Sequence, residues 1–236
     1  MIELSSPTRQ KCKIWMFKKY LQVECLRKEI DRLQKIHGDK KLKAIYGAGC
    51  IFKPDILFLF MNPTARNISA YVEWRGIRAP WIGTKNVWEL LYAVEVLSSE
   101  TFLKIKKHGQ EIWTEKFASN LYEELSKKSV YMTNLAKCTQ KDARALKDDV
   151  FKIYLRNTLE EIYTISPNKI ISFGNQVSSI LLGKKIKVSE YKKAAKETIK
   201  IKNKTFDVYP VHYPVGQGMR NMKKSISRIK YIMQVR

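Results

Sequence analysis

Three polar side chains stand at the ends of short, β-prone apolar runs of the sequence: Asn62, Asn134 and His212. Amide and neutral imidazole groups donate and accept hydrogen bonds and can hold a water molecule or a polar ligand, but they are weak bases and poor nucleophiles. The ends of these runs carry no carboxylate, no serine in a glycine-rich elbow and no glycine-rich phosphate loop. The residues therefore fit neither a hydrolase triad nor a P-loop nucleotide site.

The elements that must position these residues follow an alternating order. We predict strands at 56–61, 130–135, 169–174 and 206–212, and helices at about 86–97, 110–127, 146–165, 175–182 and 217–234. Such alternation is typical of an α/β fold with a mainly parallel sheet covered on both faces. Ligands of these folds bind beyond the carboxyl ends of the strands, where Asn62, Asn134, Asn175 and His212 are expected to meet.

The N-terminal region has a pattern of its own. Apolar residues at helical spacing over residues 11–36, with a glycine at 38, predict one long amphipathic helix. No linker, repeat or low-complexity tract separates it from the rest of the chain. We therefore expect residues 1–40 to form a helical segment packed on a single main domain, which spans 41–236.

The charge of the chain indicates its class of partner. The 236 residues include 45 Lys and Arg against 22 Asp and Glu, a formal net charge of +23. Residues 184–236 alone hold fifteen Lys and Arg against three acidic residues. The hydrophobic content of 44% excludes a disordered polybasic tail. A polyanionic partner is the favoured interpretation, and an anionic membrane surface is the weaker alternative.

Two classes of protein are disfavoured by the sequence. The chain has neither an apolar stretch long enough to span a bilayer nor a secretory signal at its N-terminus, so we expect a cytoplasmic protein without membrane association. Its four cysteines are far apart and include no C-x-x-C pair, which argues against a zinc site or a disulfide framework. We expect no metal and no cofactor.

Five segments, taken in order, resemble the uracil-DNA glycosylase superfamily. Residues 46–63 (YGAGC through PDILFLFMNP) resemble the buried strand and catalytic turn that open this family. The later segments that resemble family motifs are APWIG with NVWELLY at 79–92, VYMTNLAKC at 130–138, ISFG with LLG at 171–183, and HYP with MRN at 212–221. The third segment is similar to the iron–sulfur branch, but the cysteines needed for a four-thiolate cluster are missing.

The resemblance implies a three-layer α/β/α sandwich with a four-stranded, mainly parallel central sheet. It also implies a role for single residues in the pocket. Asn62 would position the attacking water, and His212 would donate a hydrogen bond to the uracil O2. Asn134 would read the base edge, Trp81 would stack on the base, and Met61 would also contact it. From the residue types alone, Asn62 could instead cap its turn, and Trp81 could be ordinary core packing.

The resemblance further implies a surface that binds DNA. Met219 would fill the gap left in the duplex, Arg220 would hold a phosphate, and Lys223 lies beside them. Helix starts at Asn175 and near Gly216 could offer backbone N–H groups to phosphates. The turn at Pro63 and Thr64 would also approach the DNA. Thr64 stands where the family usually has glycine, and the loop after His212 is wider than the family's loop.

The function expected from these observations is a monofunctional DNA glycosylase. It would flip out uracil and hydrolyse its N-glycosidic bond, which initiates base excision repair. The expected partner is uracil-containing DNA, and the expected oligomeric state is a monomer. Two alternatives stay open: a glycosylase for another deaminated or mispaired base, such as hypoxanthine or the thymine of a G·T pair, and a DNA-binding relative without catalysis.

Overall fold

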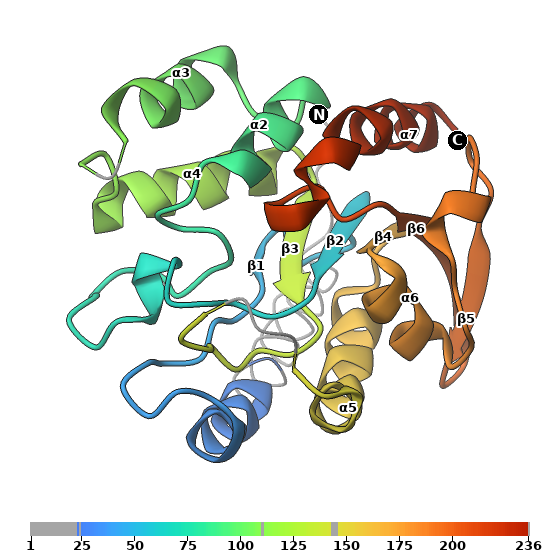
Figure 1. Ribbon diagram of the computed structural model, residues 1–236, viewed down its shortest axis with the longest axis horizontal. Coiled ribbons are helices and arrows are strands. Elements are labelled where there is room, and N and C mark those ends of the chain that lie inside the picture. Colours follow the sequence, from blue (N-terminus) through green and yellow to red (C-terminus); the bar gives the residue numbers. More distant parts are fainter. Residues whose placement is uncertain (1–22, 24, 110, 143–145, 236) are drawn as a thin grey trace, which may run out of the picture.

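The fold is built on one mixed six-stranded β-sheet (Figure 1). The computed structural model describes residues 23, 25–109, 111–142 and 146–235. The strands lie in the order β1-β3-β2-β4-β6-β5. Their bounds are Ala48–Gly49 (β1), Ile56–Phe60 (β2), Val130–Asn134 (β3), Lys169–Phe173 (β4), Glu197–Ile201 (β5) and Lys204–Val211 (β6).

The four central strands are parallel, and the two edge strands are antiparallel to their neighbours. The predicted strands are confirmed as β2, β3, β4 and β6, but the prediction of a four-stranded sheet is wrong because two edge strands extend it. β1 has only two residues. β5 alternates between half-buried and exposed side chains, so it lacks the continuous apolar run that marks a buried strand.

Helices cover both faces of the sheet (Figure 1). Phe58 and Phe60 point into a core shared with α2, α3, α4 and α7, whereas Leu57 and Leu59 point into a core shared with α5 and α6. This alternation follows from the two-residue period of a strand. The helix bounds are Asn86–Ala93 (α2), Ser99–His108 (α3), Glu115–Lys127 (α4), Asp148–Ile165 (α5), Asn175–Leu182 (α6) and Met222–Gln234 (α7).

The helix predicted at 86–97 ends as α2 at Ala93, and the one predicted at 110–127 begins as α4 at Glu115. Two larger differences concern α3 and the last helix. Helix α3 was not predicted, because Ile105 is its one fully buried residue and its apolar pattern is correspondingly weak. The predicted last helix begins as the 3-10 helix η3 (Gly216–Asn221) before α7 starts at Met222. Two further 3-10 helices are η1 (Ile68–Ala70) and η2 (Val188–Glu190). Among the described residues, no helix has the length and apolar character needed to cross a membrane.

The N-terminal helix is described from residue 25 to residue 37, while most of the predicted 11–36 segment lies outside the described residues. Its Leu33 is buried in the core that contains α5 and α6. The Gln34 amide donates to the carbonyls of Asp39 at 3.0 Å and Leu42 at 3.1 Å, and accepts from the Thr139 N–H at 2.7 Å. The end of this helix is therefore fixed to the loop that follows β3.

Candidate active site at the carboxyl ends of the parallel strands

The four parallel strands end at one edge of the sheet, which we call the carboxyl edge. Phe60 of β2 is in register with Asn134 of β3, so the turn that holds Asn62 lies beside Asn134. β4 separates β2 from β6, which places the backbones of Asn62 and His212 about two strand spacings, roughly 10 Å, apart. The topology therefore brings the three predicted polar residues to one edge.

The turn after β2 is tied to the loop after β3 by backbone hydrogen bonds. The N–H groups of Leu135 and Ala136 donate to the carbonyls of Phe60 at 2.8 Å and Met61 at 3.0 Å, which continues the strand pairing beyond Asn134. Further along, the Gln140 N–H donates to the Pro63 carbonyl at 3.1 Å. The Asn62 turn and the Asn134 strand end consequently form one backbone unit.

Asn62 is half-buried, and its Nδ2 donates to the Pro63 carbonyl at 3.1 Å. This bond is the local contact expected of a turn-capping asparagine, and it also fixes the direction in which the side chain points. Thr64 does not adopt a positive φ, so this turn does not require the glycine that the family usually has there. The half-buried side chain of Met61 packs against the core that contains α5 and α6.

Asn134 is 2% exposed, and its Nδ2 has no hydrogen-bond partner. Residues in register on parallel strands point to the same face, so the Asn134 side chain lies on the face of Phe60. The Phe60 ring stacks on Phe173 with centroids 4.5 Å apart, and Trp81 meets it edge-on at 5.0 Å. A buried donor without a partner thus borders an aromatic cluster, and such donors are costly unless a ligand or water satisfies them.

Trp81 adopts an unusual backbone conformation at the site. Its φ is +68°, which is unfavourable for a bulky residue and persists only when neighbouring contacts impose it. The Trp81 carbonyl accepts three hydrogen bonds, from the N–H and hydroxyl of Thr84 and from the Trp88 indole. The Trp81 Nε1 is buried without a partner. The ring packs on the core, so both interpretations of Trp81, stacking surface and core residue, remain compatible with its position.

His212 is half-buried directly after β6, and its carbonyl accepts from the Ser225 hydroxyl at 2.9 Å. Burial lowers the pKa of its imidazole, and the nearby cations Lys224 and Arg228 lower it further. The imidazole is therefore neutral at pH 7. Arg228 donates from Nε to the Pro210 carbonyl at 3.0 Å, which fixes α7 to the end of β6.

The predicted wedge loop extends through η3. Gly216 adopts a φ of +59°, which favours glycine, and a Cβ on Gly218 would clash with the Tyr213 carbonyl, so glycine is needed at 218. Met219 is an exposed apolar residue in this loop, and Arg220 is exposed beside it. Asn175, at the start of α6, accepts from the Val188 N–H at 2.9 Å.

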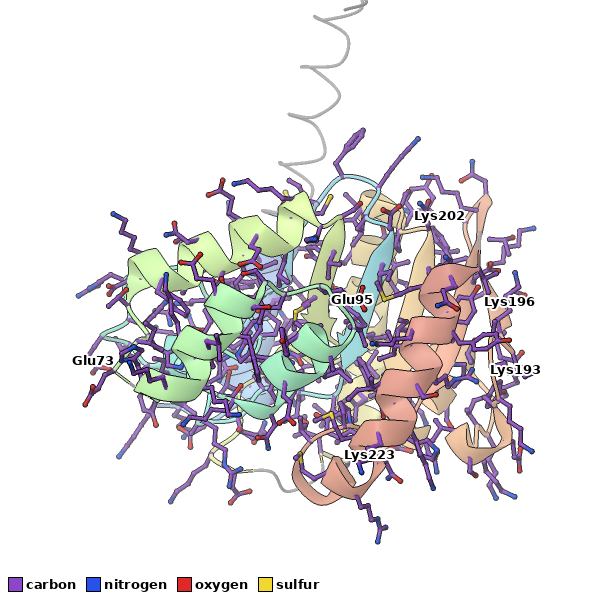
Figure 2. The ribbon with its side chains drawn as sticks, turned by 90° about the horizontal axis from the view of Figure 1, so that it is seen from above. Glu73, Glu95, Lys193, Lys196, Lys202 and Lys223 are labelled. Atoms are coloured by element: carbon purple, nitrogen blue, oxygen red, sulfur yellow. The ribbon has the colours of Figure 1, made fainter. Side chains whose placement is uncertain are left out.

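The cations near this edge differ from those elsewhere in the basic C-terminal region. Within the described part of the chain, no ion pair involves Arg220, Lys223 or Lys224, whereas Lys196 and Lys202 pair with Asp207 and Glu160 at 2.7 Å. Figure 2 shows Lys223 and Lys202 at opposite ends of the strands. The carboxyl edge therefore keeps exposed positive charge that is available to a polyanion.

DNA is the polyanion that the sequence resemblance predicts as partner, and on that prediction replacing Arg220 and Lys223 with alanine should weaken its binding and reduce the salt dependence of the affinity. Each lost phosphate contact lowers the log–log slope of affinity against salt by about 0.9 on duplex DNA, so the double variant should flatten it by about one to two units. Affinities for damaged and undamaged duplexes should fall equally, because phosphates carry no base identity. The control is Lys53→Ala with Lys128→Ala, which removes two exposed cations at the other end of the strands, neither of them in an ion pair among the described residues. Equal slopes for the wild type and the Arg220/Lys223 variant would remove this loop from the interface.

The described residues hold no metal site, and the two cavities found among them lie away from the carboxyl edge. No group of three or more His, Cys, Asp and Glu side chains is placed to hold a metal ion among the described residues. Cys25, Cys50 and Cys138 are free thiols. A small cavity between the N-terminal helix and β3 is lined in part by Tyr46 and Tyr131, and a shallow groove of about 420 Å³ lies between Tyr92 and Lys230.

Sequence reasoning missed one group at the site, the buried pair Lys137 and Glu161 on the face opposite the Asn134 side chain. A lysine in the otherwise apolar LAKC segment is the one signal that could have indicated it. Its partner lies on a distant helix, which no local pattern reveals. A scan against protein-family models and a search of curated proteins find no match to this chain.

Proposed function

We propose that this protein is a monofunctional DNA glycosylase that removes uracil from DNA. The observation that carries the proposal is the buried amide nitrogen of Asn134, which has no hydrogen-bond partner and lies beside the Asn62 turn at an edge that also carries His212. A flipped base can supply the missing hydrogen-bond partner. Helices on both faces of the sheet support the finer description of the fold as a three-layer α/β/α sandwich.

The three polar residues have separate roles in this reaction. The Asn62 Oδ1 accepts a hydrogen bond from the attacking water and orients it, since an oxocarbenium-like transition state needs a placed water more than a strong base. The neutral His212 imidazole donates to O2 of the departing base as negative charge develops there. The Asn134 amide donates to O4 and accepts from N3–H of uracil, and cytosine presents the reverse pattern.

The surrounding residues hold the nucleotide and the DNA. Trp81 stacks on the base, and Met61 contributes through its backbone at the turn. Met219 fills the gap in the duplex, while Arg220, Lys223 and the backbone near Asn175 and Gly216 contact phosphates. The turn at Pro63 and Thr64 lies against the flipped nucleotide. The protein acts as a monomer without a cofactor or a membrane, in the compartment that contains the DNA, here the cytoplasm.

The environment of Lys137 excludes it as the reactive amine of a bifunctional glycosylase. A bifunctional glycosylase uses an amine to form a Schiff base with the sugar. Lys137 follows Asn134 by three residues, but its side chain is fully buried and its Nζ contacts Glu161 at 2.7 Å. This amine is therefore not available to the substrate.

Two alternatives can be separated from this proposal by one panel of substrates. Thr64 to Arg66 follow the Asn62 turn, where they could select another base, such as hypoxanthine or mispaired thymine. Single-turnover assays with duplexes bearing uracil, hypoxanthine or a G·T pair should give the fastest excision for uracil. Faster excision of another base would assign the enzyme to that base. Tight DNA binding without excision of any base would indicate an inactive relative.

A further inference from the structure

A buried ion pair lies beneath the backbone of Asn134, on the face of the sheet that packs against α5. The Lys137 Nζ and the Glu161 carboxylate are 2.7 Å apart, and their side chains are 0% and 8% exposed. Glu161 also accepts hydrogen bonds from the Tyr131 hydroxyl at 2.7 Å and from the Thr133 hydroxyl at 3.1 Å. All four side chains therefore belong to one buried hydrogen-bonded cluster.

This cluster holds the end of β3 through two backbone carbonyls. The Lys137 Nζ donates to the Asn134 carbonyl at 2.6 Å and to the Thr158 hydroxyl at 2.9 Å. The Thr158 hydroxyl in turn donates to the Leu135 carbonyl at 3.0 Å. The Lys137 ammonium thus links the Asn134 carbonyl to Glu161 and Thr158 of α5, while the N–H groups that follow Asn134 bond to the Asn62 turn.

Stability alone is a weak reason to keep such a pair. The desolvation of two charges can exceed their attraction, and apolar replacements of buried pairs are often neutral or stabilising. Burial lowers the pKa of the Lys137 ammonium, and the Glu161 carboxylate opposes that shift. A buried charge that donates to the backbone of one strand end fixes that backbone in one geometry, which an apolar side chain cannot do.

We propose that Lys137 is a positioning residue that sets the orientation of the Asn134 amide and thereby the choice of base. The inference rests on the proposed function, because it makes Asn134 the reader of the base edge. Lys137 lies across the backbone from the Asn134 side chain and touches no substrate. Replacing Lys137 is therefore expected to change base selectivity and to make the end of β3 less rigid, in addition to any effect on folding.

The test uses the full-length double variant Lys137→Met with Glu161→Gln. It removes both charges and keeps a side-chain oxygen for Tyr131 and Thr133. Since misplacement of a recognition group by about 1 Å can cost as much as a hundredfold in rate, we expect uracil excision to fall at least about tenfold. Selectivity for uracil over cytosine should fall with it. Exchange of the Leu135 and Ala136 amide hydrogens should become at least about tenfold faster, since the strand end opens locally more often.

The matched control is Ser178→Ala. It breaks another buried hydrogen bond on the same face, the 2.8 Å contact between the hydroxyls of Ser172 and Ser178, without touching the end of β3. This variant should keep wild-type selectivity and wild-type exchange at Leu135 and Ala136. If the double variant does not fold, the positioning role is tested with Thr158→Val instead. It is isosteric and removes only the hydroxyl between Lys137 and the Leu135 carbonyl, and it should speed the same two amides.

The outcomes separate this inference from the proposed function. A wild-type protein that excises no uracil would overturn the proposed function and, with it, the role of Lys137 in base choice. An active wild type whose folded variants keep both selectivity and slow exchange at Leu135 and Ala136 would overturn the positioning role alone. Lost selectivity together with faster exchange, absent from the Ser178→Ala control, would support it.

Discussion

Replacing Asn62 or His212 with alanine is expected to lower single-turnover excision of uracil by at least about tenfold to a hundredfold, because each variant removes a hydrogen bond that the proposed reaction requires at the reacting atoms. DNA affinity should stay close to that of the wild type, since phosphates and not these side chains supply most of it. The measurement is the rate of base release with enzyme in excess, together with binding to an undamaged duplex.

The matched controls are Asn203→Ala and His108→Ala. Asn203 lies in the β5–β6 turn, before the amino end of β6, where it accepts a hydrogen bond from Tyr163. His108 is the last residue of α3, a helix that is not joined directly to any strand. Both variants should excise uracil at the wild-type rate. Wild-type rates for Asn62→Ala and His212→Ala would show that the reacting centre lies elsewhere.

Replacing Asn134 with aspartate is expected to abolish uracil excision. The change exchanges the amide donor for an acceptor, which repels O4 of uracil and can pair with the exocyclic amine of cytosine. We also expect the Asn134→Asp variant to gain a weak ability to release cytosine from an undamaged duplex. The measurement is base release from matched uracil and cytosine duplexes.

Asn157 offers a closely matched control for this change. It is 8% exposed on α5, and its Nδ2 also has no hydrogen-bond partner, so Asn157→Asp places a similar charge in a similarly buried position on the opposite face of the sheet. If it excises uracil normally while Asn134→Asp does not, the effect belongs to base reading and not to a buried carboxylate. Undiminished uracil excision by Asn134→Asp would mean that another group reads the base.

The central strands could be predicted because each is buried on both faces. All five residues of β2 are buried, and such a run is visible in the sequence without any knowledge of its neighbours. β5 was missed because an edge strand has one half-buried face and one exposed face, with Lys200 and Thr198 exposed. The sequence therefore indicated the part of the sheet that positions the site but not its full width.

In the candidate site, too, the features that follow from local sequence patterns could be predicted, and those that depend on contacts between distant segments could not. Asn62, Asn134 and His212 could be placed together because parallel strands end at one edge, so a strand prediction is also a prediction of proximity. The pairing of Lys137 with Glu161 could not be predicted, because it depends on how α5 packs on β3. The positive φ of Trp81 is likewise imposed by distant contacts, among them the Trp88 indole.

The measurement that tests the central claim most directly is the release of free base from a duplex with one uracil, with purified wild-type protein in excess and the product identified by mass spectrometry. We predict free uracil in amounts equal to the duplex, and an abasic strand that breaks only on treatment with alkali, as expected of a glycosylase without lyase activity. A duplex with cytosine at the same position should release nothing. No free uracil above the level of a reaction without protein would contradict the account.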